Sequence, residues 1–268
     1  MKRILVPCDF SAPSKEAVIV ATRLAAKAKG EITLLYVIIV PLQFNPLSIA
    51  GIEESVWQSF ESMKSELNLH DIKINLKITY GDMVLTAKNV IESEKITLVV
   101  MGTRGDSGLH ELLIGSNTEK IVRYSPVPVL AVRTAFDLHS IKRILVPTTL
   151  ALNQTEFMNY VKELQSLFDA TLDILSINTP SKFKNYDQSV LEIEEFVSHY
   201  QLKNYSKHIH DYHTEEGGII EFADSENIDM LAMATHARKG LAHLFNGSVT
   251  EKIVNRLDYP VWTFSLEK

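Results

Sequence analysis

Residues 96–116 read ITLVVMGTRGDSGLHELLIGS, an apolar run followed at once by a glycine-rich loop that ends in Gly115-Ser116. The apolar run predicts a short buried strand. Glycines at such a junction let the backbone approach a ligand closely, and Gly115-Ser116 opens a helical pattern over 117–123 whose N-terminal amides would receive an anion. The stretch therefore predicts a strand, a phosphate-binding loop and a helix.

Two segments of this chain occur twice. KRILVP at residues 2–7 returns at 142–147, and TEKIV at 118–122 returns at 250–254. Recurrence of both segments in the same order indicates a tandem duplication, and each copy is long enough for one compact domain. We therefore expect two domains, 1–137 and 138–268.

Strand patterns alternate with helix patterns in both copies. In the first copy we expect helices from Ser11 to Gly30 and over 52–69, 84–93 and 117–123, with strands at 2–7, 32–37, 72–78, 96–101 and 127–132. In the second we expect helices over 153–168, 187–202, 217–226 and 247–256, with strands at 144–146, 171–177, 205–212, 230–233 and 261–264. Such alternation predicts a mainly parallel sheet with helices on both faces, and ligands in such folds bind outside the carboxyl ends of the strands. The polar alternation of 72–78 places that strand toward a sheet edge.

The glycine loop is similar to the nucleotide-binding signature of the universal stress protein family, in which Gly, two residues, Gly, nine residues and Gly-Ser follow one another. The likeness extends to the first strand, which ends in Asp9, and to the last strand, 127–132, which follows a proline. It implies the α/β fold class with two Rossmann-like domains of the adenine nucleotide alpha hydrolase-like type, each a mainly parallel five-stranded sheet flanked by helices.

The resemblance also implies an ATP site in the first domain. Pro7, Cys8 and Asp9 would border the adenosine and Val37 would contact the base. The ribose and the phosphates would lie against a further set: Met101, Gly102, Arg104, Gly105, Gly115, Ser116, Asn117 and Thr118. A purely structural reading stands beside this one, in which Gly102 and Gly105 only allow a tight turn and Asp9 and Ser116 only cap helices.

The second copy departs from the motif. Aligned on Gly247-Ser248, it has Ala234 and Ala237 in place of the first two glycines, and Thr149 in place of Asp9. An added methyl group is costly where the backbone needs close approach. We therefore predict a degenerate second site and a second domain that serves mainly as a structural pairing partner.

Composition limits the remaining function classes. The chain has 268 residues, 46% of them hydrophobic, a mean hydropathy of +0.02 and a net charge of −6. We expect a cytoplasmic protein without a membrane segment, since neither a long apolar run nor a signal-peptide pattern is present. Residues 1–137 balance 15 basic against 15 acidic side chains and 138–268 have 12 against 18, which argues against a nucleic-acid partner. The single cysteine, Cys8, excludes an intrachain disulfide framework.

Two histidine-bearing segments carry residues that suit other chemistry. His208 and His210 alternate on one face of an expected strand and suit a shared metal, although no third ligand follows from the spacing, so we assign no metal site. His110 and Glu111 lie in the glycine loop and are read as solvent-facing rather than as an acid–base pair. No phosphate-loop lysine motif, nucleophile elbow or zinc-helix motif occurs, so we assign no catalytic residue.

The sequence thus predicts a stress-response protein that binds ATP in its first domain and acts as a regulatory or signalling module. Two alternatives stay open: slow ATP hydrolysis at the same site, with Mg²⁺ carried by the phosphates, and a nucleotide-free interaction scaffold. We expect the two domains to pair through their last strands, and we name a homodimer and an unidentified protein as further partners.

Overall fold

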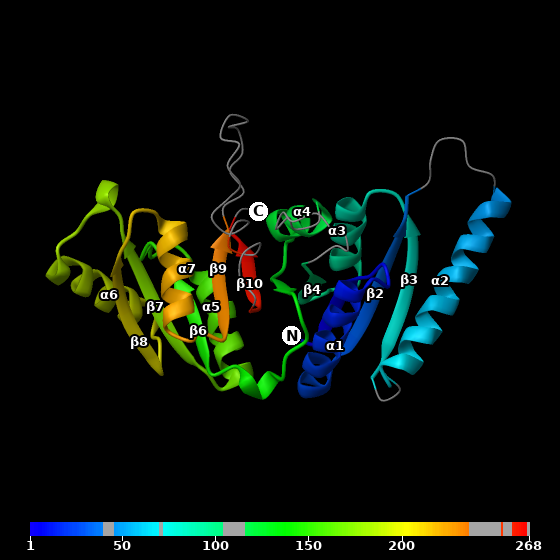
Figure 1. Ribbon diagram of the computed structural model, residues 1–268, viewed down its shortest axis with the longest axis horizontal. Helices are drawn as coiled ribbons and strands as arrows, with labels where there is room; N and C mark the ends of the chain where they lie inside the picture. The colour runs from blue at the N-terminus through cyan, green and yellow to red at the C-terminus, as the bar shows by residue number, and fades with distance from the viewer. Residues whose placement is uncertain (40–45, 70–71, 104–115, 236–252, 254–258, 267–268) are drawn as a thin grey trace. The chain divides into compact units, whose positions relative to one another are not determined.

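The computed structural model describes residues 1–39, 46–69, 72–103, 116–235, 253 and 259–266 (Figure 1). The chain divides into two compact units, Met1–Phe136 and Asp137–Lys268, called unit 1 and unit 2 below. This division lies one residue before the boundary expected from the sequence. Each unit is described by itself.

Unit 1 is a parallel sheet with strand order β3-β2-β1-β4-β5. Its elements are β1 (Arg3–Pro7), α1 (Ala12–Ala28), β2 (Glu31–Ile38), α2 (Pro46–Glu66), β3 (Ile74–Tyr80), α3 (Met83–Ser93), β4 (Leu98–Gly102), α4 (Ser116–Tyr124) and β5 (Val129–Val132). The polar alternation of β3 predicted an edge strand, and the position of β3 at the end of the sheet confirms this.

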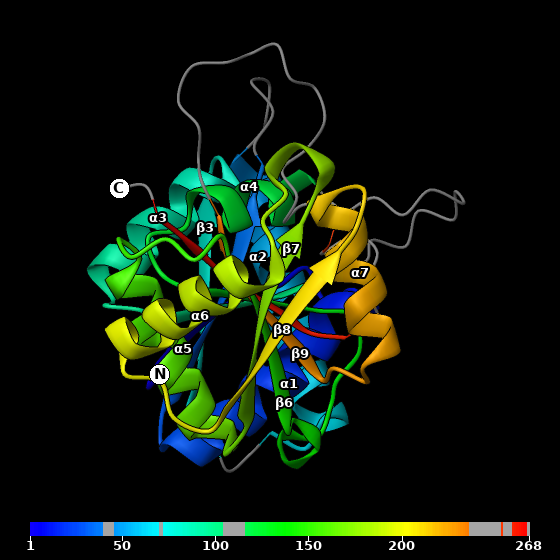
Figure 2. The same cartoon turned by 90° about the vertical axis from the view of Figure 1, so that its left-hand side faces the viewer.

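Unit 2 repeats the arrangement with strand order β8-β7-β6-β9-β10. Its elements are η1 (Leu138–Ser140), β6 (Arg143–Pro147), α5 (Thr155–Phe168), β7 (Thr171–Asn178), η2 (Pro180–Lys182), α6 (Tyr186–Tyr200), β8 (Tyr205–Asp211), α7 (Glu215–Ser225), β9 (Met230–Thr235) and β10 (Val261–Ser265). Figure 2 shows α5 and α6 on one side of this sheet and α7 on the other. The described residues confirm the predicted α/β class with parallel sheets.

The two units share their backbone course closely at the first strand. β1 and β6 have the same sequence, RILVP, and pair with the following strand in the same register, Arg3 opposite Glu31 and Arg143 opposite Thr171. Phe10 and Leu150, each three residues beyond its strand, both have a left-handed backbone with φ of 63° and 61°. The duplication read from the sequence is therefore also a duplication of backbone geometry.

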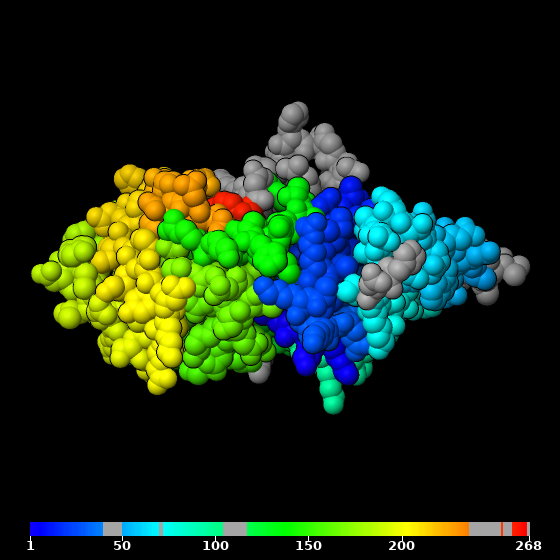
Figure 3. Space-filling view, turned by 90° about the horizontal axis from the view of Figure 1, so that it is seen from below, coloured from blue at the N-terminus to red at the C-terminus, as the bar shows by residue number. Residues whose placement is uncertain are grey.

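The first helix forms where the apolar period predicted it. In α1, Ala17, Val18, Ala21, Leu24 and Ala25 are buried, a spacing of three and four residues that keeps one face on the sheet. A proline occupies the first turn, where its missing N–H has no partner to lose. In the view from below (Figure 3), the blue segment of α1 forms part of the surface at the amino ends of the strands.

Two helices start at residues other than those expected from the sequence, and a third lies almost wholly outside the described residues. We placed the start of the second helix at residue 52, but α2 begins at Pro46, because proline suits a first helical turn and Gly51 is tolerated inside the helix. We placed the start of the first helix of the second copy at residue 153, but α5 begins at Thr155. The helix expected over 247–256 lies outside the described residues, except for Ile253.

The core of unit 1 on the side of α3 and α4 joins strands and helices in one buried cluster. Its members are Leu5, Leu35, Ala87, Val90, Ile91, Ile96, Val99, Met101, Ile121, Val122 and Val129. Met101, the residue before the end of β4, belongs to this cluster, so packing against α3 and α4 fixes the position of the carboxyl end of β4.

Candidate functional site

The candidate site of unit 1 is the edge where β1 and β4 end. β1 pairs with β2 on one side and with β4 on the other, so the order of strands reverses there. In open parallel sheets, ligands bind outside the carboxyl ends of the strands at this reversal. The predicted residues Pro7, Cys8, Asp9 and Gly102 all lie at this edge.

Cys8 closes the end of β1 rather than facing solvent. Its N–H donates to Leu35 O at 3.0 Å, and its Sγ lies 3.5 Å from Ser14 Oγ. The side chain is 3% exposed, and burial raises the pKa of the thiol despite the hydrogen bond with Ser14. Cys8 is therefore a neutral thiol, buried below the edge where β1 and β4 end.

Asp9 is exposed and held in one orientation. Its Oδ1 accepts hydrogen bonds from the N–H of Ser11 at 3.0 Å and from the Ser11 hydroxyl at 2.6 Å. Burial by itself would raise the pKa of Asp9, but the hydrogen bonds from Ser11, with a further contribution from the Ser14 side chain, outweigh it, so the pKa lies below its ordinary value. The result is an ionised carboxylate fixed beside the N-terminus of α1.

Gly102 ends β4 against the first turn of α1. A Cβ added at Gly102 would lie 2.3 Å from the carbonyl oxygen of Pro13 and 2.5 Å from its carbonyl carbon. Real side chains do not approach backbone atoms this closely, so the site demands glycine for a reason within the fold. The contact with Pro13 is a structural reason for glycine at this position, and the expectation that Gly102 gives a phosphate close access stays a prediction.

The remaining described residues of the predicted site take several roles. Met101 is 5% exposed and belongs to the buried cluster under α3 and α4, against which Val37 packs. Thr118 is buried and its hydroxyl donates to Gly102 O at 3.3 Å, which ties the first turn of α4 to the end of β4. Asn117 is exposed beside it. The hydroxyl of Thr118 is thus already engaged, which leaves its backbone amide for the predicted phosphate contact.

Part of the predicted site lies outside the described residues. This applies to Arg104, Gly105 and Gly115, and to the pair His110 and Glu111 in the same loop. Ser116 begins α4. The roles expected for these residues stay predictions.

Sequence reasoning missed Ser11 and Pro13 as members of the edge. Ser11 follows Asp9 by two residues, a spacing at which an aspartate side chain commonly accepts from the backbone, so the signal was present. The contact of Pro13 with Gly102 joins residues from distant parts of the chain and has no local signal.

The equivalent edge of unit 2 is built differently. Counted from the shared RILVP strand, Thr149, Ala151 and Asn153 replace Asp9, Ser11 and Pro13, and α5 begins three residues later in the copy than α1 does. The loop before α5 is held by the Tyr200 hydroxyl, which accepts from Gln154 N at 2.9 Å and donates to Ala151 O at 3.1 Å.

A buried ion cluster in unit 2 accounts for one of the histidines. Asp173 is 1% exposed and accepts from Arg143 Nη2 at 2.7 Å and from His208 Nε2 at 2.8 Å. Burial would raise the pKa of Asp173, but the bonds from His208 and Arg143 lower it below its ordinary value. Sequence reasoning missed this cluster because Asp173 lies among the apolar residues Leu172, Ile174 and Leu175, and its partners come from two other strands.

His210 lies two residues beyond His208. Its Nε2 comes within 2.7 Å of Glu221 Oε2, yet that nitrogen has no partner with hydrogen-bond geometry. Within the described residues, no group of three or more His, Cys, Asp or Glu side chains is arranged to hold a metal ion. His208 is thus hydrogen-bonded to Asp173, and the described residues contain no cluster of three potential metal ligands around it.

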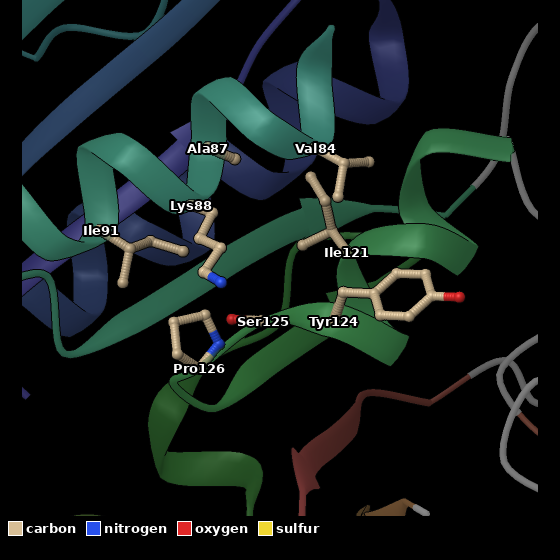
Figure 4. A pocket seen from close by; sticks show the side chains of 8 residues that line it. All are labelled: Val84, Ala87, Lys88, Ile91, Ile121, Tyr124, Ser125 and Pro126. Atoms are coloured by element: carbon tan, nitrogen blue, oxygen red, sulfur yellow. The ribbon is translucent and has the colours of Figure 1, made fainter. Parts of the chain in front are cut away.

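A shallow apolar groove runs between α3 and α4 (Figure 4). It is lined by Val84, Ala87, Lys88, Ile91, Ile121, Tyr124, Ser125 and Pro126. Lys88 extends from α3 toward Ser125, whose hydroxyl donates to Val127 O at 2.7 Å. None of these residues was predicted for the nucleotide site, and the groove is separate from the edge at Asp9 and Gly102.

This chain is similar to several known proteins in fold and in sequence. A universal stress protein from Archaeoglobus fulgidus has the same fold, with a TM-score of 0.78 at 21% identity and coverage of 99% of this chain and 98% of that one. The universal stress protein Slr1230 of Synechocystis is 25% identical over 297 residues, covering 98% of this chain and all of that protein. The universal stress protein MJ0531 of Methanocaldococcus jannaschii is 29% identical over 140 residues, covering 49% of this chain and 82% of that protein.

Two parallel five-stranded units with their first strands repeated define a tandem Rossmann-like α/β protein. Residues 1–133 and again 140–265 match the universal stress protein family, and the chain belongs to that family. The resemblance read from the glycine loop is therefore confirmed. None of the helices in the described part of the chain combines the length and apolar character that a membrane span requires.

Proposed function

We propose that unit 1 binds ATP at the edge formed by β1 and β4, and that the protein acts as an ATP-responsive regulatory module in a stress response. Asp9 is the observation that carries the proposal, because it is an exposed, ionised carboxylate oriented by Ser11 at the reversal of strand order. Ribose hydroxyls and the adenine amino group are hydrogen-bond donors, which a fixed carboxylate accepts. The glycine spacing of residues 102–116 and the family membership support the same assignment.

In this proposal unit 2 is mainly a structural partner. It carries Thr149 where unit 1 carries Asp9, and Ala151 where unit 1 carries Ser11, so it lacks both the carboxylate and the side-chain hydroxyl that helps to orient it. Pairing of the units through β5 and β10, a homodimer, a cytoplasmic location and an unidentified protein partner belong to the same proposal. Light scattering of the purified chain tests the homodimer.

Calorimetric titration of the purified protein with Mg·ATP tests the nucleotide site. We expect one site per chain in the wild type, affinity about tenfold lower in Asp9→Asn because a charge-assisted hydrogen bond is lost, and unchanged affinity in the matched control Thr149→Val. Loss of binding in Thr149→Val with Asp9→Asn unaffected would reverse the assignment of the two units.

The same titration separates the alternatives. Phosphate release that follows ATP binding and is lost in Asp9→Asn would establish slow hydrolysis at this edge. Absence of heat with ATP, ADP and AMP would refute the nucleotide site and leave the interaction scaffold. Gly102→Ala is a poor probe of ligand contact, because its methyl group meets Pro13 before any ligand is present.

A further inference from the structure

We propose that Gly102 is a positioning residue, which lets the first turn of α1 lie against the end of β4 and thereby holds Ser11 where it orients the Asp9 carboxylate. This inference deepens the nucleotide site proposed for unit 1 and rests on it for its functional meaning. Its geometric content, a coupling between residues 102 and 9, is testable without any nucleotide.

The first step is steric. The space in which a side chain of residue 102 would lie is filled by Pro13, with its carbonyl oxygen 2.3 Å and its own Cβ 3.0 Å from the added carbon. A contact of 2.3 Å with a backbone atom is relieved only if β4 or the first turn of α1 moves. β4 is held on both sides, by β1 and by β5, so the helix terminus is the part that yields.

The second step leads from Pro13 to the carboxylate. α1 begins at Ala12 and Ser11 is its N-cap residue, with Lys15 N donating to Ser11 O at 3.0 Å and Ser14 Oγ donating to the same oxygen at 2.9 Å. Ser11 in turn donates its N–H and its hydroxyl to Asp9. Movement of this turn therefore moves both groups that fix Asp9.

The third step is the comparison with unit 2, in which the four positions have changed together. Asp9, Ser11, Pro13 and Gly102 correspond to Thr149, Ala151, Asn153 and Ala234. There the helix starts three residues later in the copy, and the loop is anchored instead by Thr148 Oγ1, which accepts from Leu150 N at 2.9 Å, and by the Tyr200 hydroxyl. In unit 2, the methyl group of Ala234 near the end of β9 thus occurs together with a helix, α5, that lacks the first turn present in α1.

Nuclear magnetic resonance of ¹³C-labelled aspartate carboxyls in the full-length protein tests the coupling directly. We expect the pKa of Asp9 to rise in Ser11→Ala and also in Gly102→Ala, where Ser11 is unchanged. The control is Gly51→Ala, whose added carbon meets nothing within 4 Å and which should leave the titration of Asp9 unaltered. An Asp9 titration that is the same in Gly102→Ala as in the wild type overturns the proposal.

A double variant separates positioning from folding. Pro13→Asn with Gly102→Ala carries the pair found in unit 2, and we expect it to recover the thermal stability lost in Gly102→Ala, because the helix can start later as α5 does. The pKa of Asp9 should nevertheless stay raised, and ATP affinity should stay about tenfold below that of the wild type. If the double variant recovers stability together with wild-type Asp9 titration, Gly102 has only a structural role. If the wild type binds no ATP while the titrations behave as expected, the coupling holds and the proposed nucleotide site is what fails.

Discussion

Replacing Asp173 by Asn should weaken unit 2 strongly at neutral pH. The carboxylate is 1% exposed and receives bonds from Arg143 and His208, so an amide of the same shape leaves the guanidinium with only the more distant carboxylate of Glu226, 3.9 Å from Nη2. Breaking a fully buried pair costs about 3–5 kcal/mol. The side chains of Arg143 and His208 are 33% and 23% exposed, so water recovers part of this, and we expect a loss of about 2 kcal/mol.

Urea unfolding followed by Trp262 fluorescence measures this loss. Trp262 is fully buried in unit 2, and a Trp57→Phe background makes it the sole tryptophan reporter. The matched control is Asp169→Asn, an exposed C-cap residue with a left-handed backbone that asparagine also accepts. We expect the control to remain within about 0.5 kcal/mol of the wild type.

The pH dependence of the difference provides the refutation. Because the pKa of Asp173 is lower in the folded than in the unfolded chain, its stabilisation is fully present above the unfolded value, about 3.9, and disappears as the pH falls through the folded value. The wild-type and Asp173→Asn curves should therefore converge in acid. A difference that is constant from neutral pH down to acid, or absent at neutral pH, would show that the carboxylate is not the stabilising group.

Three further changes test other contacts. Tyr200→Phe removes the hydroxyl that serves Gln154 N and Ala151 O and should cost unit 2 about 1–2 kcal/mol in the same urea assay, and an unchanged midpoint would contradict this. Gly30→Ala places a carbon 2.4 Å from Lys2 O and should destabilise unit 1 by about 1–3 kcal/mol. Its control, Gly51→Ala, should be neutral or stabilising by up to about 1 kcal/mol. Equal melting temperatures for the two variants would contradict the steric argument. Burial raises the pKa of the Cys8 thiol, so its reaction with a thiol reagent should be slow in the folded protein and fast in urea, and rapid stoichiometric labelling of the native protein at neutral pH would refute this.

The sequence was most informative where its signals are local. The apolar period of α1, the polar alternation of β3 and the repeated RILVP strands each depend on neighbours within a few residues, and the structure confirms what they predicted. The start of α2 at Pro46 was missed because a proline and a glycine close together usually mark a loop, although both fit early positions of a helix.

The candidate site was predictable in its location but not in its contacts. Asp9 and Gly102 follow strands whose carboxyl ends meet, so their presence at one edge follows from the topology. The filling of the space beside Gly102 by Pro13 depends on how a helix crosses a strand, which no spacing of residues encodes. The same holds for Asp173, whose partners are decided by strand register.

The identity of β1 and β6 has a consequence for how this chain reaches its native state. β1 and β6 have the same sequence, RILVP. The pairing energy alone therefore does not decide whether β2 pairs with β1 or with β6 during folding, and the same holds for β7. Chain connectivity favours the native pairs, because closing the short crossover through α1 or α5 costs less chain entropy than pairing with a strand of the other copy. Lengthening either crossover would therefore raise the yield of strand-exchanged, kinetically trapped chains during refolding, even though every native contact would be retained.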